Sequence, residues 1–413
     1  MDLIIGAGVS GISYAGFTKN DYVIIEKEAE VGGYCRTIKR NNFIWDYSGH
    51  FFHFQDPSIK EYVCKSLTKD VKHGIKKFTQ IFYNNNYIDF PFQKNIHQLS
   101  KEELIDCLYD LFSADEKDNY SSFKEMVYSK YGRSIAEKFL VPYNEKLYAC
   151  DLNSLDVNAM GRFFPKASKK EIILNFKNKD NLSYNSTYSY PLGGAIEYIK
   201  SLMDYVNADN VFLNEQLVSV DIKNKIAKTT KRDIEFDNLI STIPFPQLLK
   251  ACGEEYSSED FSSNKVLVLN LGFSDKGDDT VNNWIYIPSK DYIFYRVGYY
   301  DNILKTDRMS LYVEIGFPED QELKSDEYYL EKVLQDLIKM NIVTFQKLID
   351  HEIVLMNPAY VHVTEKSKEM LDFYKKKLAK DNIYSIGRYG SWRYCSIEDN
   401  ILEARELAGD IKY

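Results

Sequence analysis

The sequence lacks an excess of basic residues, a long apolar run and any closely spaced pair of cysteines. Its 52 Lys and Arg against 61 Asp and Glu give a formal net charge of −9, which argues against a nucleic-acid partner that is bound through a basic face. No window approaches the roughly 20 apolar residues that a membrane span needs, and the apolar start lacks the basic leader of a signal peptide. We therefore expect a cytoplasmic protein without an integral membrane segment.

Cysteines are few and far apart. The six are Cys35, Cys64, Cys107, Cys150, Cys252 and Cys395. They form no C-x-x-C pair, which excludes the usual zinc spacings and does not resemble a disulfide framework. A chain of 413 residues can bury a large core in two or three domains without such links. We expect no metal and a reducing compartment.

The N-terminus carries a nucleotide-binding pattern. Residues 2–5 and 22–25 are apolar enough for two buried strands, with a helical stretch between them. In the first turn Gly6 permits a tight bend, Gly8 lets the backbone approach a pyrophosphate, and Gly11 lets the helix pack on the strand. This spacing predicts a β-α-β dinucleotide site whose helix N-terminus faces the phosphates.

The residues that follow favour FAD over NAD. Glu26 ends the second strand, where its carboxylate can accept hydrogen bonds from a ribose. Gly32, Gly33, Arg36 and Thr37 then complete the Glu-(x)n-Gly-Gly-x-x-Arg-Thr pattern of flavoproteins similar to amine oxidases. The glycine pair lets the loop pass close to the flavin, and Arg36 can meet the pyrophosphate. The alternative is an ordinary loop with a surface arginine.

Further segments, in order along nearly the whole chain, resemble the UDP-galactopyranose mutase family, and its eukaryotic-type members more than the common bacterial ones. These segments are residues 48–52, 90–96, 99–103, 142–149, 185–191, 284–288, 294–296 and 387–394. Each segment is modest evidence by itself. Together they are strong evidence, because they occur in the same order along the chain as in the family.

The resemblance implies an α/β fold in which a Rossmann-type FAD-binding domain is combined with an inserted helical domain and an antiparallel β-sheet domain. The FAD-binding domain would comprise residues 1–75, 191–245 and 381–413, the helical domain residues 95–175, and the antiparallel sheet substrate domain residues 76–94, 176–190 and 246–380.

Local patterns are compatible with this division. Ser100 and Glu103 have capping-box spacing, and the stripe of Leu104, Cys107, Leu108 and Leu111 predicts a helix with a buried face. Residues 238–244, 264–272, 283–287, 292–298 and 309–316 read as strands. The lysine-rich run 366–380 is typical of a solvated helix face, and residues 397–411 should form the last helix.

The resemblance implies a redox-neutral isomerase that interconverts the pyranose and furanose forms of UDP-galactose or a related UDP-sugar. In this family reduced FAD attacks the anomeric carbon through N5 and carries the sugar as a covalent adduct while its ring opens and recloses. NAD(P)H is the expected reductant. The activity belongs to cell-surface polysaccharide biosynthesis, and the oligomeric state stays open between a single chain and a homo-oligomer.

Retaining a charged diphosphate requires cationic side chains. Arg162 and Arg296 match the family positions and, with His50, are the predicted catalytic residues. Arg296 lies in an aromatic strand, where its buried charge needs either a ligand phosphate or an Asp or Glu partner. Tyrosine hydroxyls would share the phosphates.

The remaining site residues come from the resemblance. Cofactor contacts fall on Gly6, Gly8, Gly11, Glu26, Lys27, Gly33, Tyr34, Arg36, His50, Val218, Gly387, Arg388, Asp399 and Asn400. Substrate contacts fall on Phe92, Gln93, Phe139, Asn144, Arg162, Asn185, Tyr286, Arg296, Tyr360 and Tyr394. For each aromatic residue in this set, the alternative interpretation is an ordinary residue of the hydrophobic core.

Two positions depart from the family pattern. Tyr148 stands where the family has Trp, and Glu398 where it has Asn, near the expected diphosphate–sugar end. A carboxylate there would repel phosphate, so the identity of the sugar is open. Two further functions remain: an FAD-dependent oxidase or desaturase that shares the N-terminal motif, and a non-catalytic protein that binds FAD or UDP.

Overall fold

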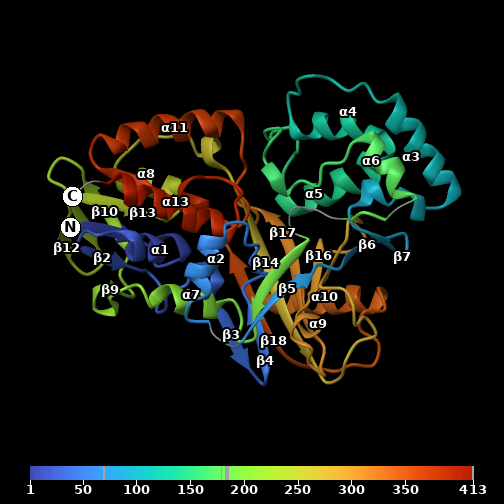
Figure 1. Cartoon of the computed structure of the whole chain (residues 1–413), viewed down its shortest axis with the longest axis horizontal. Helices are drawn as coiled ribbons and strands as arrows, with labels where there is room; N and C mark the ends of the chain where they lie inside the picture. Colours follow the sequence, from blue (N-terminus) through green and yellow to red (C-terminus); the bar gives the residue numbers. More distant parts are fainter. Residues whose placement is uncertain (68–69, 178, 182–185, 412–413) are drawn as a thin grey trace.

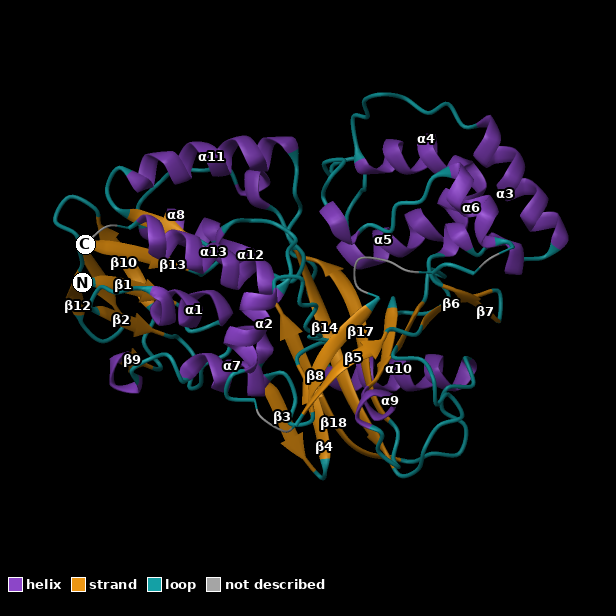
Figure 2. Ribbon diagram, viewed as in Figure 1, coloured by secondary structure: helices purple, strands orange, loops and turns teal. Residues whose placement is uncertain are grey.

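The computed structural model describes residues 1–67, 70–177, 179–181 and 186–411. Two sheets and a group of helices make up most of the molecule (Figure 1). A parallel sheet lies at the left of the view with both chain ends, the helical group at the upper right, and a seven-stranded sheet below it. Figure 2 shows that helices flank both sheets. The mixed α/β architecture confirms the predicted fold class.

The N-terminal strands belong to a five-stranded parallel sheet. Its spatial order is β19 (Ile383–Ser385), β13 (Asn238–Ser241), β1 (Asp2–Ile5), β2 (Tyr22–Ile25) and β9 (Val211–Phe212). Leu3 and Ile5 enter one apolar core while Ile4 enters another, because successive strand residues point to opposite faces. Both faces are therefore covered, as parallel sheets require.

Helices close one face of this sheet and a small sheet with two helices closes the other. The first layer holds α1 (Val9–Phe17), α2 (Pro57–Cys64), α7 (Ile196–Met203) and α13 (Ile397–Asp410). The second layer holds β10 (Leu217–Asp221), β11 (Ile226–Thr229), β12 (Asp233–Glu235), α8 (Phe245–Ala251) and α11 (Glu365–Ala379). The predicted β-α-β unit and last helix are confirmed by β1, α1, β2 and α13.

The helical group follows the predicted pattern. It comprises α3 (Lys101–Ser113), α4 (Phe123–Ile135), a π-helical turn (Ala136–Leu140), α5 (Val141–Tyr148) and α6 (Lys169–Asn175). Ser100 Oγ accepts the Glu103 N–H at 3.3 Å and so caps α3 as predicted. Cys107 and Leu111 are fully buried, and Leu104 and Leu108 pack against the same core.

The seven-stranded sheet carries the rest of the chain. Its order is β18 (Leu348–Met356), β14 (Asn264–Phe273), β17 (Ser310–Pro318), β16 (Arg296–Tyr299), β15 (Trp284–Tyr286), β6 (Thr79–Tyr83) and β7 (Asn86–Asp89). All neighbours are antiparallel except β15 and β6, which run parallel. Its front face packs on the helical group, and its back face packs on α10 (Asp326–Lys339).

One predicted strand begins later than expected. Residues 292–298 read as a strand, whereas β16 begins at Arg296. The Nζ of Lys146 donates to the carbonyls of Ile287, Ser289, Tyr292 and Phe294 at 2.5–3.1 Å. The carbonyls of 292 and 294 therefore bond the ammonium of an α5 lysine, which ties the helical group to the start of β16.

Shorter elements link these parts. They are β3 (Thr37–Arg40), β4 (Phe43–Asp46), β5 (Val71–Lys76), β8 (Thr187–Pro191), α9 (Tyr300–Leu304), α12 (Gly387–Gly390) and several single turns of 3-10 helix. All six cysteines are free thiols. Among the helices of the described ranges, none combines the length and apolar character needed to cross a bilayer.

Candidate functional site

The glycine loop is shaped for close approach by a ligand. Gly6 has φ +100°, and a side chain at Gly11 would lie 2.0 Å from the Gly6 carbonyl oxygen. Gly33, from the second glycine pair, faces Gly8: its added Cβ would lie 3.4 Å from the Gly8 Cα. Gly8 is the N-cap of α1 and supplies no side-chain cap, so N–H groups of the first turn stay available for an anion.

Glu26 is buried and fastened to this loop. Its Oε2 accepts the Ala7 N–H at 2.7 Å, and its Oε1 accepts the Glu28 N–H at 3.0 Å. Arg36 donates through Nε to the Gly33 carbonyl at 2.9 Å, and its Nη1 lies 3.5 Å from Glu30. Lys27, by contrast, is mostly exposed and lies 3.6 Å from Glu28. The loop thus offers a glycine cradle, an acid and a guanidinium in the arrangement that FAD would need.

A second wall comes from the C-terminal segment. Gly387 has φ +88°, and a Cβ there would lie 2.5 Å from Ser10 Oγ. Ser10 Oγ also donates to Asn400 Oδ1 at 3.3 Å. Asp399 serves in the capping box at the start of α13, where its backbone N–H reaches Ser396. Gly387 and Asn400, both predicted for the cofactor, therefore meet the glycine loop.

Arg388 extends from this wall toward a group of tyrosines. Its guanidinium carbon lies 4.8 Å from the ring centroid of Tyr394 and 5.3 Å from that of Tyr360. Its Nε is buried without a hydrogen-bond partner in the described part of the chain. Burial opposes its charge, but the surrounding phenols, with Tyr389 foremost, raise the pKa of Arg388. An unpartnered guanidinium nitrogen beside the glycine cradle fits an electron-rich ring or carbonyl of a cofactor.

His50 lies in the loop between these parts. Its Nδ1 is 3.0 Å from the Ser48 carbonyl oxygen. Burial lowers the pKa of His50 to about 4, and the charges of Arg388 and Arg296 lower it further. The imidazole is therefore neutral near pH 7, with Nδ1 donating to Ser48 and Nε2 left as an acceptor. The Tyr34 ring packs edge-on to that of Tyr389 at 5.8 Å, and burial raises the pKa of Tyr34 to about 12.

Arg296 has a carboxylate partner on the neighbouring strand. The β16–β17 register places it opposite Glu314, whose Oε1 and Oε2 accept from Nη2 at 2.7 Å and from Nε at 2.9 Å. Ser48 Oγ donates to the same carboxylate at 2.5 Å. Burial opposes the charge, and Glu314 nevertheless holds the pKa of Arg296 well above its ordinary value. Nη1 has no hydrogen-bond partner among the described residues, so one edge of the guanidinium remains for a ligand.

Three predicted tyrosines gather around the two arginines. The rings of Tyr360 and Tyr394 lie 5.7 Å apart. Burial raises the pKa of Tyr286 and of Tyr394 to about 12, while the charge of Arg296 partly opposes the shift at both. Tyr286 and Tyr394 therefore stay neutral near pH 7, and their hydroxyls can donate hydrogen bonds. This front-face cluster of Tyr286, Arg296, Tyr360, Arg388 and Tyr394 is cationic, and its donors suit an anionic ligand.

An aromatic path leads away from the front-face cluster. Ring centroids are 5.0 Å apart for Tyr286 and Tyr143, 5.2 Å for Tyr143 and Phe139, and 5.4 Å for Phe139 and Phe92. Phe92 is fully buried behind Phe139.

Two predicted amides are chain neighbours of rings on this path, Gln93 of Phe92 and Asn144 of Tyr143. Gln93 donates to the Pro165 carbonyl, and Asn144 donates to the Leu140 carbonyl at 2.6 Å. Their Oε1 and Oδ1 atoms are buried without a partner in the described ranges. Two unsatisfied acceptors beside stacked rings can recognise the edge of a nucleobase.

Other predicted residues lie at the margin. Arg162 donates to Asp399 at 2.8 Å and to Ser396 at 3.2 Å, and the neighbouring Phe163 packs edge-on to Tyr394 at 4.7 Å. Val218 is exposed at a bulge of β10. Asn185 lies outside the described residues.

The two departures from the family pattern take different positions. Glu398 is buried, and its Oε1 accepts the N–H groups of Gln55 and Asp56, both at 2.8 Å. The side chain that was expected to face the phosphates is therefore tied to the loop before α2. The Tyr148 ring lies 5.8 Å from Tyr360, and its hydroxyl is buried without a partner in the described chain.

Glu314 is the residue that sequence reasoning missed. An acidic residue inside the apolar stretch 309–316, which is the next predicted strand after that of Arg296, is the signal that could have identified it. The pairing itself depends on strand register, which the sequence alone does not state.

Comparisons with known proteins agree with this architecture. The model of a family described as flavin containing amine oxidoreductase matches residues 12–412. The chain is similar to a reduced UDP-galactopyranose mutase at TM-score 0.90 and 21% identity, over 98% of this chain and 92% of that one. A putative protoporphyrinogen oxidase from Exiguobacterium sp. 255-15 gives TM-score 0.79 and 15% identity, over 99% and 98%. Cyclohexylamine oxidase from Brevibacterium oxydans IH-35A matches at TM-score 0.69 and 11% identity, over 99% of this chain and 98% of that one.

Proposed function

Since the chain belongs to the family of flavin containing amine oxidoreductases, and its cofactor is therefore FAD, we propose that it is a nucleotide-sugar mutase. It would interconvert the pyranose and furanose forms of a UDP-linked sugar, with UDP-galactose as the first candidate. The observation that carries the proposal is the front-face cluster, where Arg296 and three tyrosine hydroxyls converge beside Arg388 and His50. The likeness to a UDP-galactopyranose mutase, at TM-score 0.90, supports it.

The cofactor would be held by the two walls. The α1 N-terminus and the glycines would bind the pyrophosphate, Glu26 the ribose, and Gly387 with Arg388 the flavin ring. When bound and reduced, FAD supplies an electron-rich nitrogen that can act as a nucleophile toward a sugar. The reaction then requires no net oxidant, and the protein's task is to orient the sugar and retain its leaving group.

The front-face cluster would retain the diphosphate. The free edge of Arg296 and the hydroxyls of Tyr286, Tyr360 and Tyr394 are donors that strengthen as negative charge develops on the leaving oxygen. Arg162, at the edge of the site, would supply a second positive charge if its guanidinium left Asp399 and bound the phosphate instead. Asn185 stays a proposed contact.

The aromatic path would hold the uracil and its ribose. Phe139 offers a ring for stacking, and the unpartnered acceptors of Gln93 and Asn144 suit the base N–H. His50, neutral and anchored to Ser48, would accept a hydrogen bond near the flavin rather than carry a charge.

A second candidate is an FAD-dependent oxidase, which the family and the two oxidase structures favour. An oxidase of amines has no use for a guanidinium among the tyrosines of its substrate side, because a cationic or nascent iminium substrate would be repelled. The third possibility, a binding protein without turnover, rested on Glu398, whose carboxylate bonds the backbone instead.

The test uses the purified holoprotein with a panel of UDP-sugars, with and without dithionite. We expect conversion of a UDP-hexopyranose to its furanose isomer only after reduction, with no net oxidation of sugar or flavin. Product analysis by chromatography and NMR measures it. Oxygen consumption with an amine, and no isomerisation of any sugar, would assign the chain to the oxidases.

A further inference from the structure

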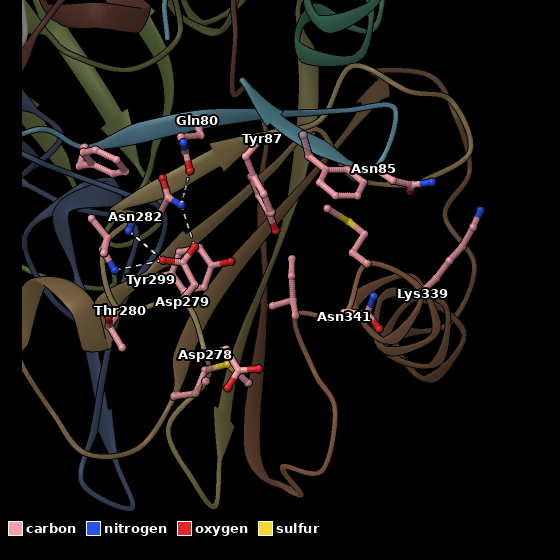
Figure 3. Close-up of a pocket in the computed structure, with 17 residues that line it drawn as sticks. Gln80, Asn85, Tyr87, Asp278, Asp279, Thr280, Asn282, Tyr299, Lys339 and Asn341 are labelled. Carbon is pink, nitrogen blue, oxygen red and sulfur yellow. Dashed lines mark hydrogen bonds between the residues drawn. The ribbon is translucent and has the colours of Figure 1, made fainter. Parts of the chain in front are cut away.

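A cavity opens on the back face of the seven-stranded sheet. It has a volume of about 590 Å³ and lies between the β6–β7 hairpin, the loop before β15 and the C-terminal end of α10 (Figure 3). Its walls include the rings of Phe82, Tyr87 and Tyr299 together with Met309 and Ile342. The volume is within the range of small-molecule sites, roughly 300–1,000 Å³.

Two buried polar atoms in this wall have no hydrogen-bond partner among the described residues. Tyr299 is 1% exposed and Asn282 is 4% exposed. The Tyr299 hydroxyl and the Asn282 Oδ1 make no hydrogen bond to any part of the chain that the structure describes. The amide nitrogen of Asn282 is already used by Gln80 and Asp279, at 3.1 and 2.7 Å. A buried unsatisfied group in a cavity wall calls for a ligand or an ordered water.

The charge of the cavity is negative. Asp278 and Asp279 both line it, and Asp279 is held by the N–H groups of Val281 and Asn282 at 3.0 and 2.9 Å. The carbonyl end of α10 adds partial negative charge. The one cation that lines the cavity in the described chain, Lys339, places its Nζ 4.7 Å from the Tyr292 ring, and in Figure 3 its side chain points away from Asp279.

The two phenols lie near the same carboxylate. Burial and then Asp279 raise the pKa of Tyr87 to about 12, and the same two causes raise the pKa of Tyr299 well above its ordinary value. Both are neutral hydroxyls near pH 7, with lone pairs that can accept. Residues with acceptor oxygens from three elements therefore line this one cavity together with aromatic rings.

We propose that this back-face cavity binds a small organic ammonium ion. An ammonium has only donors, which match the Asn282 Oδ1, the phenol oxygens and the Asp279 carboxylate. The aromatic rings favour a cation over a neutral molecule of equal size. Anionic ligands are excluded by the two carboxylates, so a UDP-sugar does not fit here.

This site is separate from the front-face cluster. Arg296 and Tyr299 are three residues apart on β16 and point to opposite faces of the sheet. Ligands of the two sites therefore have no surface in common, and UDP should not compete with an ammonium ion.

The test titrates the holoprotein with benzylammonium chloride and, as a neutral isostere, with benzyl alcohol, by isothermal titration calorimetry. We expect saturable binding of benzylammonium, about tenfold tighter than the alcohol, that excess UDP does not displace. Asp279→Asn should weaken it about tenfold and Tyr299→Phe about fivefold. The matched control is Tyr328→Phe, which changes an exposed tyrosine of α10 outside the cavity and should leave the affinity unchanged.

Several outcomes would overturn the proposal. These are no saturable binding, equal affinity for the alcohol and the ammonium, or unchanged affinity in both cavity variants that still melt cooperatively. Displacement by UDP, or bleaching of the flavin spectrum by the amine, would place the ammonium on the front face instead. If Asp279→Asn fails to fold, Tyr299→Phe and Tyr87→Phe decide the question, because Tyr87 is 40% exposed and its hydroxyl is not needed for the core.

Discussion

The two faces of the seven-stranded sheet carry opposite electrostatics on the same strands. On the front of β16, Arg296 is surrounded by tyrosines and keeps one donor edge for an anion. On the back, Tyr299 lies beside Asp279 among acceptors. Because strand residues alternate between faces, three positions along one strand are enough to reverse the preferred ligand charge. The backbone ladder between them keeps the two sites apart.

The faces also differ in how their charges are compensated. Glu314 is 1% exposed and is bonded by both Arg296 and Ser48, so the front acid is neutralised and the cluster keeps net donor character. On the back, the donors that Asp279 has among the described residues are all neutral, which leaves its charge to a ligand. The sign of the ligand charge that each site prefers therefore depends on whether the carboxylate of that site is paired with a cationic side chain.

Removing the front guanidinium is the strongest way to break this contrast. Arg296→Ala should weaken UDP binding about 100-fold, because truncating one member of a buried charged contact costs about 2–5 kcal/mol. Calorimetry gives the UDP affinity, and flavin absorbance per protein on the same sample gives cofactor content.

The expected signature is selective. Flavin content and the affinity of the back-face cavity for benzylammonium should not change, whereas Arg296→Lys should recover part of the UDP affinity. Glu314 is left buried without its partner, so a lowered melting temperature is expected as well. Unchanged UDP affinity would remove Arg296 from the site, and simultaneous loss of flavin would show a global defect.

Acid should lower the stability of the protein through two histidines, His50 and His53, the second of which has its Nδ1 2.9 Å from the Thr187 carbonyl oxygen. Burial lowers the folded-state pKa of both His50 and His53 to about 4, whereas an unfolded histidine titrates near 6.5. Between pH 4 and 6.5 the unfolded chain binds more protons than the folded chain. The free energy of unfolding therefore keeps the whole histidine contribution above pH 6.5 and loses it as the pH falls toward 4. Each histidine contributes up to about 3 kcal/mol of this loss.

Thermal melts between pH 4 and 7.5 measure this dependence. His50→Asn should flatten the slope by about one proton, and His351→Asn, at an exposed position of β18, should not. A slope that is the same with and without His50 would contradict a buried neutral imidazole.

The nucleotide-binding module could be predicted from sequence because its determinants are local. Glycine spacing, two short apolar runs and one acid predict β1, α1, β2 and the position of Glu26, and the structure has these elements. The strands of the large sheet were likewise evident from β-branched and aromatic runs.

Partners at long range could not be predicted in the same way. The Arg296–Glu314 pair depends on the β16–β17 register, and the late start of β16 depends on Lys146, about 150 residues earlier in the chain. The back-face cavity brings together a hairpin, a loop and a helix end, none of which has a motif. Such contacts follow from tertiary packing rather than from spacing.

A single hydroxyl offers a finer test of the front face. Tyr286→Phe should weaken UDP binding at least about tenfold, because a hydrogen bond to a charged partner is worth about 1.5–3 kcal/mol. Stability should change little because the ring still packs on Tyr143. Tyr299→Phe, the same change on the back face, is the matched control and should leave UDP affinity unchanged. Equal effects of the two variants would refute the separation of the faces.

The smallest expected effect concerns Glu398. It follows Tyr394 of the front-face cluster by four residues, but its carboxylate bonds the backbone N–H groups of Gln55 and Asp56. Glu398→Gln keeps an oxygen that accepts the N–H groups of Gln55 and Asp56, so UDP affinity should stay within about twofold and stability within about 0.5 kcal/mol. Glu398→Ala removes the one oxygen that accepts both N–H groups and should cost about 1–3 kcal/mol of unfolding free energy, still without a selective effect on UDP. Calorimetry and thermal melts on the pair separate the two roles. A several-fold gain of UDP affinity in Glu398→Gln would mean that the carboxylate repels the phosphates after all, and that the ligand charge favoured on the front face is set partly from α13.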